Sequence, residues 1–415
     1  MKSKENLKKS AEKYIDSISN DIYKTGEMLM NMPELGYKEF KTSEFVYQKL
    51  KNLFPNTQKN ITVTGVKAKL TGRKHLANIC IMGELDAVIS PEHPNADPVT
   101  GAAHACGHNI QLANMLACAE ALKNSGIMES LDGDVTFLAV PSEEFIDMDY
   151  RNKLKNDGKI KYFSGKQEML HLGVFNDIDA AMMVHSQANC PQKKLFIGGG
   201  GLGFTAKTIK FIGKEAHAGG APFDGINALN AASAALTMIG LQRETFKDED
   251  KIRVHSIITK GGDSVNTVPA DVRMELYVRG ATESAIANAE KKVENAINGA
   301  AYGIGAKAEI TTVGSYAPLH QNEKLSRIFA DNAKGLVDEI CFGVDMIGST
   351  DVGDLCKVLP VIQPTIGGFC GGAHSKDFHA SDKYLTHVVP AKIMVNTVID
   401  LLYNNAENMH EIRKD

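Results

Sequence analysis

The chain has 415 residues, of which 43% are hydrophobic and 23% are charged, and its formal net charge is -4 at pH 7. This length favours two domains over one, and the composition is that of a folded globular protein rather than a disordered one. The near balance of charges argues against a nucleic-acid-binding surface, so we expect no nucleic-acid partner.

Residues 1–20 are rich in Lys, Glu and Ser and lack the unbroken apolar core of a signal peptide. We expect no later stretch to approach membrane-spanning length, and therefore no membrane partner. The seven cysteines are an odd number without paired short spacings, which fits reduced thiols better than a disulfide framework. Together these features predict a cytoplasmic protein.

The first part of the chain alternates helix and strand signals, as α/β domains do. Residues 10–32 form a predicted helix that ends near Pro33, and residues 77–82 and 135–140 are predicted buried strands. Between these strands, residues 109–123 contain no Gly or Pro and predict a further helix. The pattern therefore predicts a domain in which helices flank a sheet.

The pattern changes near residue 195. The run Gly198–Gly201 is a natural hinge, and the segments after it follow the order βαββαβ, which is ferredoxin-like. These predicted strands and helices are residues 205–212, 226–246, 252–259, 272–279, 282–302 and 308–313. We therefore predict one domain formed by residues 1–195 and 314–415, and a second domain, inserted into the first, formed by residues 196–313.

Residues of the kinds that bind metal ions are concentrated in four separated segments and one further position. These are Gly83–Asp86, His104–His108, Pro141–Glu144, His374–His379 and His185. Thiolate, imidazole and carboxylate groups together suit zinc, manganese or a similar divalent ion. Because the set exceeds what one open catalytic zinc site uses, we expect two divalent ions.

Glu143 and Glu144 follow directly on the predicted strand 135–140. Ligands of α/β sheets bind beyond the carboxyl ends of strands. Adjacent carboxylates point in different directions, so one can bind a metal ion while the other handles the proton of an attacking water.

Cys106 and His108 lie where a loop enters the predicted helix 109–123. Such a location suits chemistry, because helix N-termini present side chains and free backbone N–H groups. One alternative is that Cys106 is a thiol nucleophile with His108 as its base, and another is that it is a buried structural thiol. The other ligand-type segments favour a metal-ligating thiolate.

The motif H-A-C-G-H at residues 104–108, together with the paired glutamates, resembles the amidohydrolase branch of the dinuclear metallopeptidases of aminoacylase and carboxypeptidase type. That branch includes hippurate hydrolases, plant auxin-conjugate hydrolases and aminobenzoyl-glutamate hydrolases. The resemblance spans nearly the whole chain. It implies an α/β catalytic metal-binding domain with a mixed sheet flanked by helices, an inserted ferredoxin-like lid and dimerisation domain, and a homodimer.

The resemblance also implies roles for residues that match the motifs of the family. The metal ligands would be Cys106, His108, Glu144, His185 and His374. Cys106 would bridge the two ions, which would be zinc or manganese, with cobalt or nickel as replacements in vitro. Glu143 would be the general base and acid, and Asp86 would orient a neighbouring ligand.

Three residues of the inserted domain are candidates for contact with the substrate. By resemblance, His217 would reach the active site of the partner subunit and stabilise the oxyanion, and Asn266 would contact the substrate. Without the resemblance His217 would be an ordinary loop histidine. Arg279 either pairs with a substrate carboxylate or is a solvated charge at the end of a strand.

Two departures from the family pattern bear on the substrate. Residues 84–86 (ELD) lack the histidine of the H-x-D motif of other branches, as expected if Cys106 and His108 compensate. Hippurate-type members usually continue H-A-C-G-H with D-G-H, whereas this chain has Asn109-Ile110-Gln111. That difference favours an aminobenzoyl-glutamate-like compound or a dipeptide over a simple N-acyl amino acid.

The predicted function is therefore that of a metal-dependent amidohydrolase or peptidase. Metal-activated water would cleave the amide bond of a small N-acyl amino acid, an aminobenzoyl-glutamate-like compound or a dipeptide. The alternative is a catalytically silent relative that binds metal or a peptide as a scaffold or sensor.

Overall fold

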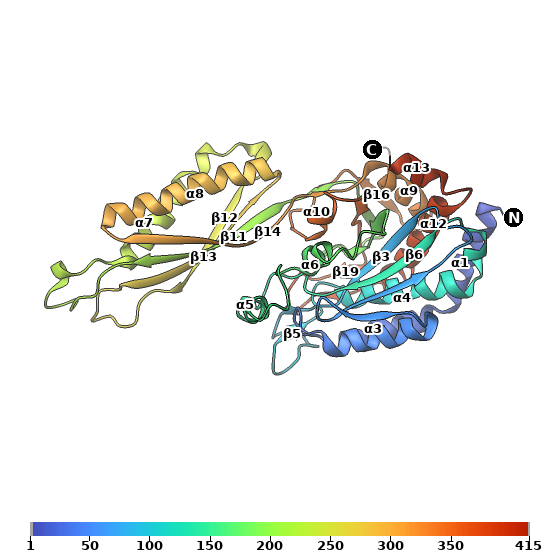
Figure 1. The fold of residues 1–415 in the computed structure, drawn as a ribbon, viewed down its shortest axis with the longest axis horizontal. Coiled ribbons are helices and arrows are strands. Elements are labelled where there is room, and N and C mark those ends of the chain that lie inside the picture. Colours follow the sequence, from blue (N-terminus) through green and yellow to red (C-terminus); the bar gives the residue numbers. More distant parts are fainter. Residues whose placement is uncertain (1–2, 414–415) are drawn as a thin grey trace. The chain divides into compact units, whose positions relative to one another are not determined.

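The computed structural model describes residues 3–413. The chain divides into two compact units (Figure 1). The first comprises the chain up to Gly199, His320–Asp345 and the chain from Asp354, and the second comprises Gly200–Leu319 and Met346–Gly353. The second unit is thus made of two chain segments, both enclosed by segments of the first.

The segment Met346–Gly353 lies in the second unit, although the predicted boundaries assign it to the other domain. Its backbone pairs with the start of that unit: Met346 N–H donates to Gly200 O over 2.9 Å, and Leu202 N–H donates to Gly348 O over 3.1 Å. The domain boundaries at 195/196 and 313/314 stay a prediction, because compactness alone does not establish that a unit folds or acts independently.

The first unit is built around a six-stranded mixed sheet in the order β1-β2-β6-β3-β7-β17. Its strands are β1 (Gln58–Ile61), β2 (Gly65–Leu70), β3 (Asn78–Glu84), β6 (Asp134–Val140), β7 (Ala180–Met182) and β17 (Val361–Ile362). β3 runs parallel to both β6 and β7, and β2 pairs antiparallel with β6. Every residue of β3 and β6 is buried, as their continuous apolar runs predict.

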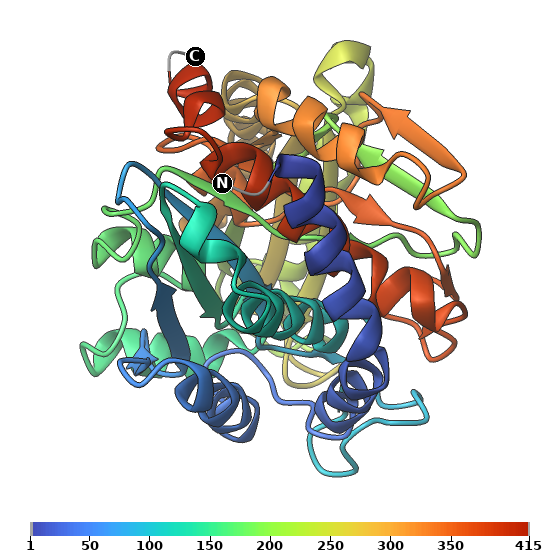
Figure 2. The same ribbon diagram turned by 90° about the vertical axis from the view of Figure 1, so that its right-hand side faces the viewer.

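Long helices flank this sheet (Figure 2). They are α1 (Lys4–Ser17), α2 (Ser19–Met30), α3 (Phe40–Leu53), α4 (His108–Asn124) and α12 (Val389–Leu402). α4 packs on β3 and also on α1, α2, α3 and α12, so nearly all of its residues are buried. A helix in that position must be apolar on all sides, which explains the Ala- and Leu-rich sequence of α4.

The predicted helix over residues 10–32 is wrong in one respect, because the chain forms two helices there. α1 ends at Ser17 and α2 begins at Ser19, with Ile18 between them at φ -103° and ψ 9°. The Ser17 hydroxyl donates to Tyr14 O over 2.6 Å. Such local side-chain bonds offer the backbone an alternative to the helical pattern.

Shorter elements complete the first unit. The helices are α5 (Met148–Asn156), α6 (Gly165–His171), α9 (Glu323–Ala333), α11 (Lys383–His387), α13 (Glu407–Ile412) and the 3-10 turn η1 (Ile127–Ser130). A second, four-stranded sheet has the order β16-β9-β18-β8. Its strands are β16 (Glu339–Phe342), β9 (Lys194–Ile197), β18 (Thr365–Ile366) and β8 (His185–Ser186). Two small ladders pair β4 (Val88–Ile89) with β5 (Ala102–Ala103) and β19 (Phe369–Cys370) with β20 (His379–Ala380).

The second unit has the predicted ferredoxin-like order. Its elements are β11 (Gly203–Ile212), α7 (Ala228–Leu241), β12 (Arg253–Lys260), β13 (Asp271–Gly280), α8 (Glu283–Ile304) and β14 (Lys307–Tyr316). The strands form an antiparallel sheet in the order β12-β13-β11-β14, and α7 and α8 pack on it through a shared apolar core. Its remaining short elements are η2 (Pro222–Asp224), η3 (Arg243–Thr245), η4 (Asp248–Asp250) and β10 (Gly200–Gly201). β15 (Leu319–His320) and α10 (Val352–Leu355) begin in this unit and end in the first.

One stretch, Lys383–Leu402, is long and apolar enough to cross a membrane by length and composition. The expectation that no stretch approaches this length is therefore wrong. The stretch covers α11 and α12 and is buried in the structure except for Lys383 and Tyr384 at its start, and a buried core helix passes the same test. Its charged residues have partners: Lys392 Nζ lies 2.7 Å from Asp16 Oδ1, and Lys8 Nζ lies 2.7 Å from Asp400 Oδ2.

Candidate metal centre

Two parallel strands bring the acidic segments of the site together. β3 ends at Glu84 and β6 ends at Val140, and these two residues are partners in the ladder. Just beyond them, Leu85 N–H donates to Val140 O over 2.8 Å. Residues 84–86 and 141–144 therefore leave the same edge of the sheet, which is where α/β proteins bind their ligands.

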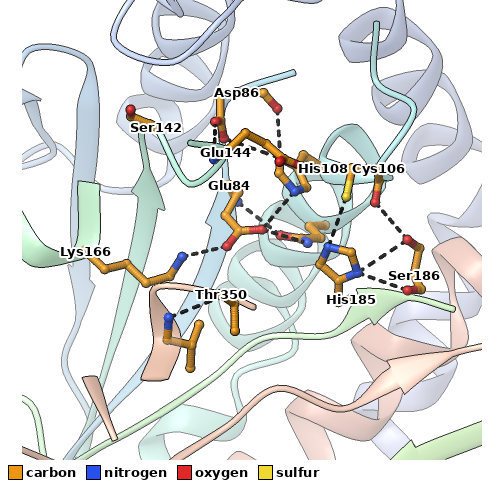
Figure 3. Close-up of polar contacts among 12 residues, drawn as sticks. Glu84, Asp86, Cys106, His108, Ser142, Glu144, Lys166, His185, Ser186 and Thr350 are labelled. Carbon is orange, nitrogen blue, oxygen red and sulfur yellow. Dashed lines mark hydrogen bonds and ion pairs between the residues drawn. The ribbon is translucent and has the colours of Figure 1, made fainter. Parts of the chain in front are cut away.

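Cys106 and His108 flank the turn at the N-terminus of α4. Gly107 has φ 87° and ψ 12°, a left-handed conformation that favours glycine, and a Cβ there would lie only 3.0 Å from Ser186 Cβ. The turn therefore requires glycine. Nδ1 of His108 lies 2.8 Å from the backbone oxygen of Asp86 (Figure 3). A carbonyl oxygen only accepts, so Nδ1 carries a proton, and in the neutral ring Nε2 offers a lone pair.

Cys106 belongs to two groups of ligand-type atoms. It lies with His108 and His185 in one group and with Glu144 and His374 in the other, and the atoms of each group are within 4.8 Å of one another. Cys106 Sγ lies 3.5 Å from His185 Nε2 (Figure 3), and His374 Nε2 lies 3.1 Å from Glu144 Oε1. A thiolate shared by two groups is the arrangement that one sulfur bridging two ions requires.

The donor set fits divalent ions of the zinc type. Thiolate and imidazole are zinc ligands, and a carboxylate also suits manganese. In addition, Nε2 of His108 is buried and has no hydrogen-bond partner within residues 3–413. A buried lone pair without a donor is unfavourable, and a metal ion would satisfy it.

The turn that carries the paired glutamates is held by buried groups. Glu144 N–H donates to Asp86 Oδ2 over 2.9 Å, and the Glu144 carbonyl accepts from the buried guanidinium of Arg151. Ser142 has φ 58°, and its N–H donates to Glu39 Oε1 over 2.8 Å. A non-glycine residue keeps a left-handed conformation only where its surroundings enforce it. These contacts fix the backbone on either side of Glu143.

Asp86 and Glu143 both lie beside His108. Asp86 Oδ1 lies 3.4 Å from His108 Nδ1, and Asp86 Oδ2 accepts from Glu144 N–H. Asp86 therefore contacts one residue in each of the two groups of ligand-type atoms that contain Cys106. This position suits the predicted role of orienting a ligand. Glu143 is 7% exposed and forms a third group of ligand-type atoms with Glu84 and His108. Its role as general base stays a prediction.

The electrostatics of the site favour bound cations. Burial raises the pKa of the Cys106 thiol, but the positive fields of His185 and His108 outweigh burial and bring the pKa to about 6. Hydrogen bonds with Cys106 and Glu144 raise the pKa of His374 to about 11. The thiolate and the carboxylates thus attract positive charge, and divalent ions would compete with protons for the same groups.

Two further residues of the site, Glu84 and Lys166, were assigned no role from the sequence. Both side chains are fully buried, and Lys166 Nζ lies 2.6 Å from Glu84 Oε1 (Figure 3). Burial raises the pKa of Glu84, but Lys166 and His108 hold it at about 2. The place of Glu84 at the end of a buried strand, two residues before Asp86, could have indicated it. Nothing local marks Lys166, which comes from the short helix α6.

Asn109 and Gln111, which differ from the hippurate-type motif, both form hydrogen bonds within the first unit. Asn109 is buried, and its Nδ2 donates to Gly26 O on α2 over 3.1 Å. Gln111 Nε2 donates to Glu84 Oε2 over 3.0 Å. These contacts tie α4 to α2 and to the end of β3, so Asn109 and Gln111 both have a packing role beside the site.

The three candidate substrate-contacting residues of the second unit lie in two different parts of that unit. His217 pairs with Thr267 in an isolated bridge, and Ala218 N–H donates to Asn266 O over 2.9 Å, so His217 and Asn266 come from adjoining exposed segments. Arg279 lies on β13, where its Nη1 donates to Ser349 Oγ over 2.8 Å. The structure therefore brings His217 and Asn266 together.

Residues 80–398 match Peptidase family M20/M25/M40. The chain belongs to this family. It is therefore an enzyme of the metal-dependent amidohydrolase and metallopeptidase kind, as predicted, and it shares the fold of that family.

Two relatives and one solved structure illustrate the range of this family. The Xaa-Arg dipeptidase of Homo sapiens is 28% identical over 335 residues, which are 77% of this chain and 70% of that protein. The N-acyl-L-amino acid amidohydrolase of Geobacillus stearothermophilus is 24% identical over 318 residues, 75% of this chain and 81% of that protein. A dinuclear metal binding peptidase of the M20 family from Bacillus subtilis superposes with a TM-score of 0.72 at 21% identity, covering 93% of this chain and 99% of that one.

Proposed function

We propose that this protein hydrolyses the amide bond of a small N-acyl amino acid, an aminobenzoyl-glutamate-like compound or a dipeptide with the help of two divalent metal ions. The observation that carries the proposal is that two groups of ligand atoms share Cys106 Sγ at the carboxyl edge of the sheet. The names of the two relatives, a dipeptidase and an N-acyl amino acid amidohydrolase, support two of the three substrate classes.

Zinc or manganese would be held by His108 and His185 on one side of Cys106 and by Glu144 and His374 on the other. The mixture of thiolate, imidazole and carboxylate supports either metal, and cobalt or nickel would substitute in vitro. Such ions, when bound, polarise a carbonyl oxygen and lower the pKa of water.

The residues of the chain would then move the protons and steady the developing charge. Glu143 would accept the proton of the attacking water and return it to the leaving amine. Nδ1 of His217 accepts hydrogen bonds from Gly219 N–H (3.2 Å) and Gly220 N–H (2.8 Å), so a neutral His217 carries its proton on Nε2. That N–H is available to donate to the oxyanion of the tetrahedral intermediate.

Arg279 would bind the carboxylate of the substrate, and Asn266 would contact the substrate beside His217. The guanidinium carbon of Arg279 lies 5.4 Å from the ring centre of Phe204 and 5.8 Å from that of Tyr277, and Nη1 is held by Ser349 Oγ. These contacts hold the planar guanidinium in one orientation, which suits two parallel hydrogen bonds to a carboxylate. All three substrate classes contain a free carboxylate.

We expect the protein loaded with manganese or zinc to release product from at least one of three substrate panels: aminobenzoyl-glutamate, N-acyl amino acids and dipeptides. Chromatographic detection of the released amine checks this expectation and identifies the acyl group and the leaving amino acid. If a protein with two bound ions per chain released product from none of the panels, the catalytically silent alternative would replace this proposal.

We also propose that the protein is a cytoplasmic homodimer that associates through the second unit. β12 forms an edge of the sheet in that unit, and Ile257 on this strand is 62% exposed. An edge strand with exposed apolar side chains is a ready site for pairing with another chain. Free thiols at all seven cysteines support a reducing compartment.

If His217 acts at the site of the partner subunit, each active site combines residues from two chains. We then expect that mixing the inactive variants Glu143→Gln and His217→Ala restores part of the activity, because hybrid dimers contain one site with both wild-type residues. The measurement is turnover after subunit exchange, with hybrid formation verified by differently tagged chains. Verified hybrids without activity would show that His217 does not act across the interface.

A further inference from the structure

A lysine lies buried beside the proposed metal centre. The side chain of Lys166 on α6 is 0% exposed, and its Nζ lies 2.6 Å from Glu84 Oε1, which is also 0% exposed. A buried ammonium group is strongly unfavourable unless an opposite charge compensates it. Lys166 therefore requires an ionised Glu84, and the contact fixes the direction of the Glu84 carboxylate.

The second oxygen of Glu84 faces His108. Glu84 Oε2 lies 3.1 Å from His108 Nε2, yet this nitrogen makes no hydrogen bond within the described part of the chain. The ring proton of His108 is on the opposite nitrogen, because Nδ1 contacts the backbone oxygen of Asp86 at 2.8 Å. In the neutral ring, which is the form that binds a metal ion, two lone pairs, one on oxygen and one on nitrogen, thus lie next to each other without a proton between them.

Such a pair is unfavourable by itself and is the arrangement of two ligands on one metal ion. Nitrogen and oxygen ligands lie about 2.0–2.2 Å from zinc, so two ligands of one tetrahedral ion are about 3.3–3.6 Å apart. The 3.1 Å between Glu84 Oε2 and His108 Nε2 is close to this range. Gln111 further fixes Glu84, since its Nε2 donates to Oε2 over 3.0 Å and its Oε1 accepts from Glu84 N–H over 3.2 Å.

We propose that Glu84 is a further ligand of the ion that His108 would hold, with Oε2 as the ligand atom, and that Lys166 is a positioning residue that retains Oε1. The proposal rests on the two-ion site proposed above. In that arrangement Lys166 and the ion each take one oxygen of the carboxylate. If the pair served only to attach α6 to the end of β3, its loss would change the stability of the fold but not the affinity for metal.

The test compares Glu84→Gln, Lys166→Met and the double variant with the wild type. Asp400→Asn is the matched control, because Asp400 is also a buried carboxylate of the first unit, and its contact with Lys8 Nζ at 2.7 Å involves none of the proposed metal ligands. Metal-free proteins are titrated with zinc and with manganese in a calorimeter. Bound metal is counted by mass spectrometry after dialysis, and melting temperatures are recorded with and without metal.

We expect the double variant, which leaves no unpaired buried charge, to bind one ion with wild-type affinity and the other about 10-fold or more weakly. Glu84→Gln is expected to show the same weakening, and Asp400→Asn none. Lys166→Met leaves the Glu84 charge uncompensated until metal binds, so metal should raise its melting temperature by more than it raises that of the wild type.

Wild-type affinity for both ions in the double variant would overturn the assignment of Glu84. If that variant failed to fold, the Lys166→Met protein decides: a metal-induced rise in melting temperature no larger than that of the wild type would overturn the assignment as well. A wild-type protein that binds fewer than two ions would instead overturn the two-ion site itself.

Discussion

Replacing Glu143 with glutamine is expected to lower turnover by roughly 10²–10⁴-fold, because glutamine keeps the size of the side chain but cannot accept a proton. The metal content should stay at the wild-type value, since Glu143 belongs to neither of the groups that contain Cys106. Steady-state kinetics on a substrate identified by the panels, together with metal analysis of the same sample, check both parts of the expectation.

Glu129→Gln is a suitable control for this variant, because Glu129 is an exposed glutamate of the same unit, on η1. It should match the wild type in both measurements. Turnover within a few-fold of wild type in Glu143→Gln would remove Glu143 from the role of general base. Loss of bound metal in that variant would instead make Glu143 a ligand.

Replacing Cys106 with alanine is expected to remove metal and hydrolysis together, because this substitution deletes the one atom that both groups of ligands share. Metal analysis after dialysis and an activity assay with added metal check this expectation. Cys118→Ala is the matched control. Cys118 lies on α4, which begins two residues after Cys106, and is fully buried. Among the hydrogen bonds of the described residues, its Sγ contacts only the backbone oxygen of Ala391, at 3.6 Å.

The same experiment separates a metal-ligating thiolate from a thiol nucleophile. Exhaustive chelation leaves Cys106 in place, so a thiol hydrolase would keep its activity, whereas a metal-dependent enzyme loses it and regains it on addition of zinc or manganese. Full activity after verified metal removal would contradict the proposed function.

Most of the regular structure follows from sequence periodicity. The predicted strands at 77–82 and 135–140 are β3 and β6, and the predicted helix at 109–123 is α4. Each of these segments has a clear hydrophobic pattern, and the βαββαβ order of the second unit was predicted from patterns of the same kind. The break between α1 and α2 was not predicted, because hydrophobic pattern does not mark it; beside it the Ser17 hydroxyl donates to Tyr14 O.

The residues of the candidate site that lie in short motifs were predictable from the sequence. The H-A-C-G-H segment, the paired glutamates and the resemblance they carry identified Cys106, His108 and Glu144, and the structure gathers these residues with His185 and His374. Lys166 was not predictable. It stands alone in the sequence, and only the packing of α6 brings its Nζ to Glu84.

The sequence by itself determined the family, the kinds of ligand and the order of the elements, because these depend on residue type and local spacing. Tertiary structure alone decided which atoms face one another. The parallel register of β3 and β6 sets Glu84 beside Val140, and the left-handed turn at Gly107 directs Cys106 and His108 toward the same place. It also decided that Asn109 contacts α2, because the direction of a side chain depends on every element packed around it.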